Sequence, residues 1–253
     1  MSLGPGDPGL LAPAARAALE RARVVVGYRT YMALVDPALL EGKETVSTGM
    51  MGEMERCRAA IQACREGRDT ALISSGDAGI YGMAGLALEI LHEEGLSEDV
   101  EVEVVPGIPA LAAAAALLGA PLMHDFAVVS LSDLMTPWET IQRRIEAAAV
   151  ADFVIVIYNP RSRKREGHLA EALQLIGGHR PPETPVGLVR NAFRDDQSVG
   201  VYTLTDLDPA HADMLSILIV GNAATRILDG RMVTPRGYLA KYGGDSSHRR
   251  PDR

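Results

Sequence analysis

Residues 70–79 read Thr70-Ala71-Leu72-Ile73-Ser74-Ser75-Gly76-Asp77-Ala78-Gly79, a short apolar run followed at once by a glycine-bearing turn. The run has the length and composition of a buried strand, and residues 81–94 beyond the turn show the apolar spacing of a helix. A strand, a narrow turn and a helix in this order belong to a βαβ unit. The stretch therefore predicts an α/β fold with a mostly parallel sheet.

Two further turns repeat this arrangement. Gly4-Pro5-Gly6-Asp7 stands at the beginning of the chain, and Pro106-Gly107-Ile108-Pro109 follows the apolar residues 102–105. The carboxyl ends of parallel strands meet at one edge of a sheet, where ligands bind. Glycines there allow backbone groups to approach a ligand closely. We expect the turns to converge on one crevice for a small molecule.

The composition narrows the class of protein. With 253 residues the chain can form two modest α/β domains. A net charge of −8 and an aromatic content of 4% argue against a nucleic-acid partner, because such surfaces are basic and offer aromatic platforms for bases. Residues 110–118 are the longest apolar helix candidate and are too few to cross a bilayer, and no secretory signal is visible. We expect a cytoplasmic protein without a membrane partner.

The two cysteines fit that compartment. Cys57 and Cys64 lie on one expected helix, where about 10 Å of rise separates them, too far for a disulfide. We expect reduced, helix-packing thiols.

The order of elements changes near Gly119-Ala120-Pro121, which we take as the boundary between domains 1–119 and 120–242. In the first domain helices are expected over 13–21, 49–67, 81–94 and 109–118, and strands over 23–27, 70–74 and 101–105. In the second, strands are expected over 125–131, 153–158, 185–189, 198–204 and 215–220, with helices over 137–149 and up to 176. The second domain should hold a mixed sheet. The polar residues 243–253 are expected to be a disordered tail.

The first glycine turn has an unusual setting, since only Met1-Ser2-Leu3 precede it. Either the first strand is a stub, or the natural chain starts further upstream. Residues 4–9 also match the G-x-G-x-x-G pattern of dinucleotide-binding folds. Pro5 and Pro8 disfavour a helix starting at Gly9, and strand 23–27 ends in glycine rather than in a ribose-binding acid. A nucleotide-dependent oxidoreductase therefore stays an alternative only.

The three turns, with residues 75–82 and 105–110 quoted in full, resemble the motifs of the tetrapyrrole methylases, which transfer methyl groups from S-adenosylmethionine to corrin precursors. Residues 124–138, Tyr158-Asn159-Pro160-Arg161-Ser162-Arg163 and Thr234-Pro235-Arg236-Gly237-Tyr238 resemble the branch that methylates carbon 17 of precorrin-3B. The likeness covers roughly residues 3–240. It implies a cobalamin-pathway enzyme that also promotes contraction of the macrocycle.

The resemblance also implies an architecture and a donor site. It implies two α/β domains of the tetrapyrrole methylase type, with the methyl donor in the cleft between them, and a homodimer. By motif, the donor-binding residues are Pro5, Ser75, Gly76, Asp77, Ile80, Pro109, Ala110, Asn159 and Ala192. Backbone groups of narrow turns suit such a donor, since they satisfy its polar groups without burying side-chain charges.

Two acidic residues in these turns have a second interpretation. Asp77 could cap the turn that follows it or contact the ligand. Asp7 could cap a turn ahead of Pro8 or face the substrate, and we favour the substrate side, with Asp7 as a catalytic residue, because no helix is expected to begin there for it to cap.

Basic residues are concentrated in Arg161-Ser162-Arg163-Lys164-Arg165, where a helix is expected to start. The dipole of a helix disfavours cations at that end, so helix stability does not explain them. A solvated loop is one interpretation. The other is a cradle for the carboxylates of a corrin precursor, with Arg161, Arg163, Lys164, Asp133 and Arg190 as substrate-binding residues and Arg194 extending the surface.

Proton transfer is assigned to His124, with Ser130, Ser132 and Asp133 as its expected neighbours and Ser132 as a further catalytic candidate. The six histidines show no metal-ligand spacing, so no metal site is expected.

Three alternative functions stay open. They are a sister methylase acting elsewhere on the corrin ring, an enzyme modifying protein or ribosomal RNA, and a donor-binding protein without activity. The sequence does not distinguish a metal-free from a cobalt-bearing substrate.

Overall fold

The computed structural model describes residues 1–162 and 164–242, which divide into two compact units. Unit 1 comprises Met1–Ala113 and Ala192–Asp195, and unit 2 comprises Ala114–Asn191 and the described residues from Asp196 onward. The expected domain boundary lay slightly later, at residue 119. The tail expected over 243–253, and Arg163, lie outside the described residues.

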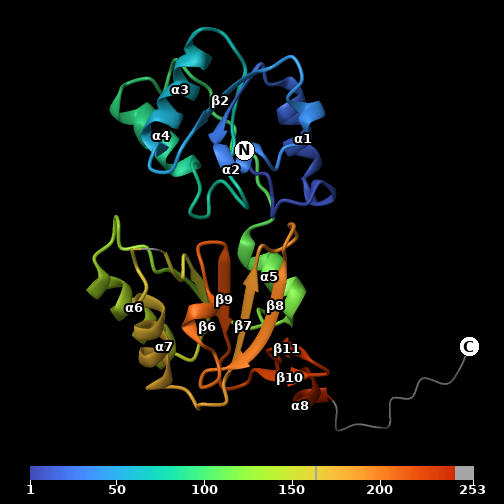
Figure 1. Cartoon of the computed structure of the whole chain (residues 1–253), viewed down its shortest axis with the longest axis vertical. Coiled ribbons are helices and arrows are strands. Elements are labelled where there is room, and N and C mark those ends of the chain that lie inside the picture. Colours follow the sequence, from blue (N-terminus) through green and yellow to red (C-terminus); the bar gives the residue numbers. More distant parts are fainter. Residues whose placement is uncertain (163, 243–253) are drawn as a thin grey trace, which may run out of the picture. The chain divides into compact units, whose positions relative to one another are not determined.

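Unit 1 contains a parallel sheet between helices. Strands β1 (Val24–Tyr28), β2 (Glu44–Thr48) and β3 (Thr70–Leu72) pair in the order β2-β1-β3, all parallel. Figure 1 shows α3 and α4 on one side of this sheet and α1 on the other. The helices are η1 (Pro8–Leu10), α1 (Pro13–Arg21), α2 (Arg29–Met32), η2 (Pro37–Leu39), α3 (Glu53–Arg65), α4 (Ala84–Glu93) and the start of α5 (Ala110–Leu118).

Alternate side chains of β1 hold the two helical layers to the sheet. Val25 packs with Leu19 of α1, whereas Val24 and Val26 pack with Ala60 and Ala63 of α3. A strand buried on both faces reads as a continuous apolar run, as 24–26 does. The predicted parallel α/β sheet is confirmed.

The residues before the first glycine turn form a stub of a strand. The Leu3 amide donates to the Ser74 carbonyl at 2.8 Å, and the Ser74 amide donates to the Met1 carbonyl at 3.0 Å. This parallel bridge continues β3 at its end and brings the first turn beside the second.

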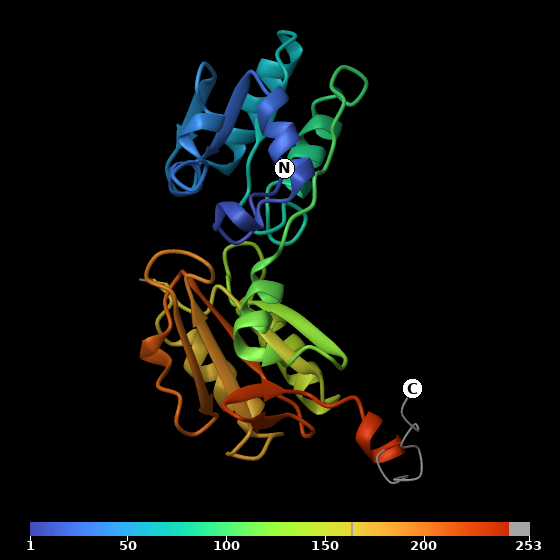
Figure 2. The same cartoon turned by 90° about the vertical axis from the view of Figure 1, so that its right-hand side faces the viewer.

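The strand predicted over 101–105 is wrong. These residues form no ladder with a neighbouring strand, and Figure 2 shows them as a plain trace along unit 1. Val102 and Val104 are 40% and 46% exposed, whereas Val105 is buried. The physical reason is the lack of a paired neighbour: 101–105 and 70–72 both line a cavity of about 550 Å³ instead of pairing with each other.

Unit 2 is built on a mixed sheet, as predicted. Its five strands have the order β5-β6-β9-β7-β8, in which β5 and β6 are parallel and the other neighbours antiparallel. They are β5 (Phe126–Ser130), β6 (Val154–Tyr158), β7 (Pro185–Arg190), β8 (Ser198–Thr203) and β9 (Ser216–Val220). A small second sheet has the order β10-β11-β4, formed by β10 (Arg226–Leu228), β11 (Arg231–Val233) and β4 (Gly119–Ala120).

Helices α6 (Trp138–Val150) and α7 (His168–Gly177) cover one face of the larger sheet. Ile145 and Ile176 pack there against Ile155, Ile157 and Leu218. Gly187 of β7 leaves room for Leu118, since a Cβ on it would lie 2.3 Å from a Leu118 methyl carbon.

The remaining helices are η3 (Pro209–His211) and α8 (Tyr238–Tyr242). No described helix combines the length and apolar character needed to span a membrane.

Candidate functional site

The three glycine turns meet in unit 1. The Gly4 amide donates to the Gly76 carbonyl at 3.0 Å, and the Gly76 amide donates to the Gly4 carbonyl at 2.8 Å. Gly4 and Gly76 have φ values of +68° and +66°, which L side chains rarely adopt. The pair therefore depends on glycine at both positions.

The third turn is held to the other two at close range. The Gly107 amide donates to the Asp77 carboxylate at 2.9 Å. A Cβ on Gly107 would lie 2.5 Å from the Ser2 Cβ and 2.7 Å from the Gly76 carbonyl oxygen, so only glycine fits. A Cβ on Gly76 would lie 3.6 Å from the Ala110 amide nitrogen. The predicted convergence of the turns is confirmed within unit 1.

Ser2 links the second glycine turn to the residues just before the third, and sequence analysis missed this role. Its buried hydroxyl donates to the Val105 carbonyl at 2.6 Å and accepts from the Ala78 amide at 2.8 Å. A single serine in a three-residue stub carries no sequence signal for such a role. Its role is visible only in the structure, where the Ser2 side chain lies between the second and third turns.

Asp77 has the structural role considered for it. One carboxylate oxygen accepts from the Gly79 amide at 2.8 Å, and the other from Gly107. Both oxygens thus already receive backbone hydrogen bonds.

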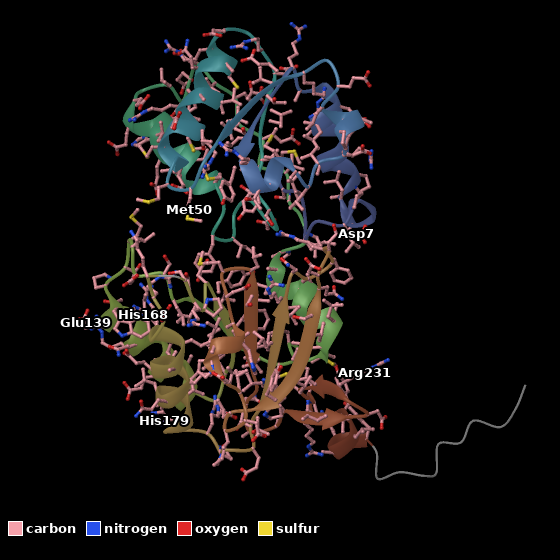
Figure 3. The ribbon with its side chains drawn as sticks, in the orientation of Figure 1. Asp7, Met50, Glu139, His168, His179 and Arg231 are labelled. Carbon is pink, nitrogen blue, oxygen red and sulfur yellow. The ribbon has the colours of Figure 1, made fainter. Side chains whose placement is uncertain are left out.

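Asp7 was expected not to cap a helix, and that expectation is wrong. The 3₁₀ helix η1 begins at Pro8, and the Asp7 carboxylate accepts from the Gly9 amide at 2.7 Å. The side chain is exposed, so its second oxygen is open to a ligand. Figure 3 shows Asp7 and Met50 toward the same end of unit 1.

Arg194 contacts the first and second turns. Its guanidinium donates to the Pro5 carbonyl and to the Ser75 hydroxyl, and its stem lies where a Cβ on Gly6 would come within 2.8 Å. Burial lowers the pKa of Arg194. Arg194 and Ala192 both belong to unit 1, whereas Arg161 belongs to unit 2.

The turn surface of unit 1 combines a half-buried cation, Arg194, with exposed apolar surface on Ile80 and Tyr81, which are 38% and 56% exposed. Pro109 and Ala110 are half-buried beside Gly76. Among the residues predicted to bind the donor, Pro5 and Ser75 share Arg194, and Gly76 lies beside Pro109 and Ala110.

In unit 2 the predicted residues gather at one sheet edge. Strands β5, β6 and β7 run in the same direction, so Ser130, Asn159 and Arg190 lie at their carboxyl ends. The Asn159 side-chain amide donates to the Ser130 hydroxyl at 2.9 Å, and the Ser132 amide donates to the same hydroxyl at 3.2 Å. Asn159 has a φ of +51°, a left-handed turn that asparagine tolerates.

The basic turn divides into a buried and an open part. Arg165 is buried and donates to the Leu131 and Asn159 carbonyls at 2.8 and 3.2 Å, with Asp133 at 3.5 Å. Lys164 is exposed, and Arg161 donates to the Ala210 carbonyl at 3.1 Å. The expected helix start is corrected, because α7 begins only at His168.

Arg190 is engaged by an acid. Its Nε donates to Asp213 at 2.6 Å. Hydrogen bonding to Asp213 raises the pKa of Arg190. This neighbour reduces the positive charge that Arg190 presents to a ligand.

The expected neighbourhood of His124 is wrong. His124 precedes β5 and accepts the Asp125 amide on its Nδ1 at 2.8 Å, whereas Ser130, Ser132 and Asp133 lie at the other end of that strand. Five strand residues span roughly 16 Å, far beyond hydrogen-bond reach.

The histidine near Asp133 is His168, whose Nε2 lies 3.2 Å from that carboxylate. Its ring also packs on Trp138, with the ring centroids 4.0 Å apart. Figure 3 shows His168 at one end of the α6–α7 pair and His179 at the other. The sequence offered no reason to choose His168, because its partner lies 35 residues earlier.

Comparison with known proteins agrees with these features. The family model described as Tetrapyrrole (Corrin/Porphyrin) Methylases matches residues 1–208. A probable cobalt-factor III C(17)-methyltransferase of Salmonella typhimurium is 53% identical over 238 residues, which are 94% of this chain and 98% of that protein.

Two solved structures extend the likeness to the fold. The methyltransferase CobJ is 37% identical with a TM-score of 0.88, covering 92% of this chain and 97% of its own. A uroporphyrin-III C-methyltransferase of Thermus thermophilus, complexed with S-adenosylhomocysteine, is 25% identical with a TM-score of 0.64, covering 87% and 95%. The chain therefore belongs to the tetrapyrrole (corrin/porphyrin) methylases and is a methyltransferase.

Proposed function

We propose that this protein transfers a methyl group from S-adenosylmethionine to carbon 17 of a corrin precursor, and promotes ring contraction, in cobalamin biosynthesis. The likeness to the Salmonella typhimurium protein over nearly the full length of both chains carries this proposal. Relatives named for cobalt-factor III favour the cobalt-bearing substrate over metal-free precorrin-3B. We expect the enzyme to act in the cytoplasm as a homodimer.

The donor would lie against the three glycine turns. S-adenosylmethionine, when bound, supplies a methyl group to an electron-rich ring carbon, and the electron pair of the broken carbon–sulfur bond stays on the thioether product. The residues proposed to hold it are Pro5, Ser75, Gly76, Asp77, Ile80, Pro109, Ala110 and Ala192 in unit 1 and Asn159 in unit 2. The glycines contribute by letting the turns approach one another closely, and Asp77 by fixing the turns.

Methyl transfer demands alignment and exclusion of water more than a strong base. Rigid turns serve alignment, since Ser2, Asp77 and Arg194 each bond to residues of two segments. A proton must still leave or reach the ring during contraction. We favour His168 with Asp133 for this step, with Ser132, Asp7 and His124 as the other candidates.

The substrate would bring its own negative charge. Acetate and propionate side chains of a corrin precursor suit Arg161, Lys164 and Arg190, with Asp133 orienting neighbouring cations and Arg163 adding charge by sequence. Arginine grips carboxylates with two parallel hydrogen bonds, whereas lysine acts as a point charge.

One incubation tests the proposal. The purified chain is mixed with S-adenosylmethionine and either cobalt-factor III or metal-free precorrin-3B, and the pigment is analysed by mass spectrometry and NMR. We expect one added methyl group, located on carbon 17, with the cobalt-bearing pigment preferred. A methyl group at another ring carbon would favour a sister methylase, and binding of donor without product would favour a protein without activity.

A further inference from the structure

Arg194 is a half-buried cation of unit 1 without a carboxylate partner. Its guanidinium donates to Pro5 and Ser75, and among the described residues no Asp or Glu contributes to its pKa. Cations removed from water are normally paired with an opposite charge. The titrating group that acts on it is Tyr31, whose own pKa is raised by burial, so that its phenol is neutral at pH 7. Unit 1 therefore supplies no counter-ion.

The acids of the neighbouring turns are already engaged. Asp77 accepts two backbone amides, and Asp7 accepts the Gly9 amide. Neither carboxylate forms an ion pair with Arg194, although Asp7 and Asp77 lie in the two turns that Arg194 joins through Pro5 and Ser75. The positive charge of Arg194 can therefore pair with an anionic group of a ligand.

The guanidinium also retains donors. Arginine has five N–H groups in a fixed plane, and the bonds to Pro5 and Ser75 use two of them. The two bonds fix the plane, so the remaining donors have a defined direction. Gly6 permits this placement, because any side chain there would displace Arg194.

We propose that Arg194 binds a carboxylate of a ligand held at the three glycine turns. This inference rests on the proposed function, which offers two sources of that carboxylate: the amino-acid end of the methyl donor, and the acetate or propionate side chains of the tetrapyrrole. The bonds to Pro5 and Ser75 preorganise the guanidinium for either.

Calorimetric titration separates the sources. The full chain and its variants Arg194→Gln and Arg194→Lys are titrated with S-adenosylhomocysteine, with methylthioadenosine, which lacks the amino-acid end, and with the tetrapyrrole. Arg23→Gln, at an exposed arginine of the same unit, is the matched control. A donor carboxylate predicts that Arg194→Gln weakens S-adenosylhomocysteine by about 10–100-fold and leaves methylthioadenosine unchanged.

A tetrapyrrole carboxylate predicts instead that only the pigment binds more weakly. In either case Arg194→Lys should restore part of the affinity, because it keeps the charge. Equal weakening of all ligands, or of none, would overturn the inference. Failure of the unaltered protein to bind S-adenosylhomocysteine would count against the proposed function and not against Arg194.

Discussion

Gly4 and Gly76 exchange two backbone hydrogen bonds, of 3.0 and 2.8 Å, although one stands at the beginning of the chain and the other after β3. Both have left-handed backbones, so neither tolerates a side chain without strain. Because Gly107 packs on this pair, three turns from distant segments act as one rigid surface. The methyl donor is proposed to bind there.

Replacement of Gly107 by alanine should damage that surface. The new methyl group would lie 2.7 Å from the Gly76 carbonyl oxygen and 2.5 Å from the Ser2 Cβ, so backbone must move. We expect a loss of about 1–3 kcal/mol in the free energy of unfolding, and a larger proportional loss of S-adenosylhomocysteine affinity. Urea unfolding and calorimetry measure the two effects.

The matched control is Gly85→Ala in α4, where a Cβ would meet open space. Alanine favours helix over glycine, so stability should stay level or rise. If Gly107→Ala behaved like Gly85→Ala, the close packing of the third turn would have no energetic weight.

Ser2→Ala should destabilise unit 1 through lost hydrogen bonds. Its hydroxyl satisfies the Val105 carbonyl and the Ala78 amide, and removing it leaves buried groups unpaired. The expected cost is about 1–3 kcal/mol by urea unfolding. Ser47→Ala, on an exposed position of β2, should stay within about 0.5 kcal/mol of the unaltered chain. A similar cost for both variants would contradict this role for Ser2.

Substitutions in the basic turn should affect either stability or substrate binding, depending on whether the buried Arg165 or the cations Arg161 and Lys164 are changed. Arg165→Ala removes hydrogen bonds to Leu131 and Asn159 and leaves Asp133 without that partner, so we expect a loss of about 2–3 kcal/mol in stability. Charge reversal at Arg161 and Lys164 should instead weaken tetrapyrrole binding and spare binding of S-adenosylhomocysteine. Fluorescence or absorbance titration of the pigment measures this. Equal loss of both ligands would refute the cradle.

Thiol labelling should distinguish the two cysteines. Burial raises the pKa of Cys57 to about 11, whereas Cys64 is partly exposed. At pH 8 only about one Cys57 side chain in a thousand is then a thiolate, the form that reacts. We expect one rapidly labelled thiol per native chain with Ellman's reagent and two in denaturant. Rapid labelling of both native thiols would contradict the buried position of Cys57.

Much of the fold was predictable because its signals are local. Val24–Val26 and Thr70–Leu72 show strand composition, and Pro13 marks the start of α1. The segment 101–105 has the same composition but forms no strand, since strand formation also requires a partner edge. Composition alone does not reveal whether that edge is present.

The site was predictable where it consists of backbone and less so where it consists of side chains. Glycine spacing predicted that the turns around Gly76 and Gly107 meet. The roles of Ser2, Arg194 and His168 come from contacts across 35 to 189 residues, which no periodicity encodes. His124 was grouped with Ser132 by proximity in sequence, but β5 carries them to opposite ends.

Hydrogen–deuterium exchange with and without S-adenosylhomocysteine tests the central claim most directly. If the donor binds across the joined turns, amides of residues 3–10, 74–82 and 107–112 should gain protection together at the same ligand concentration. Protection of one of these segments alone, or of none while the ligand is bound, would contradict a shared donor surface.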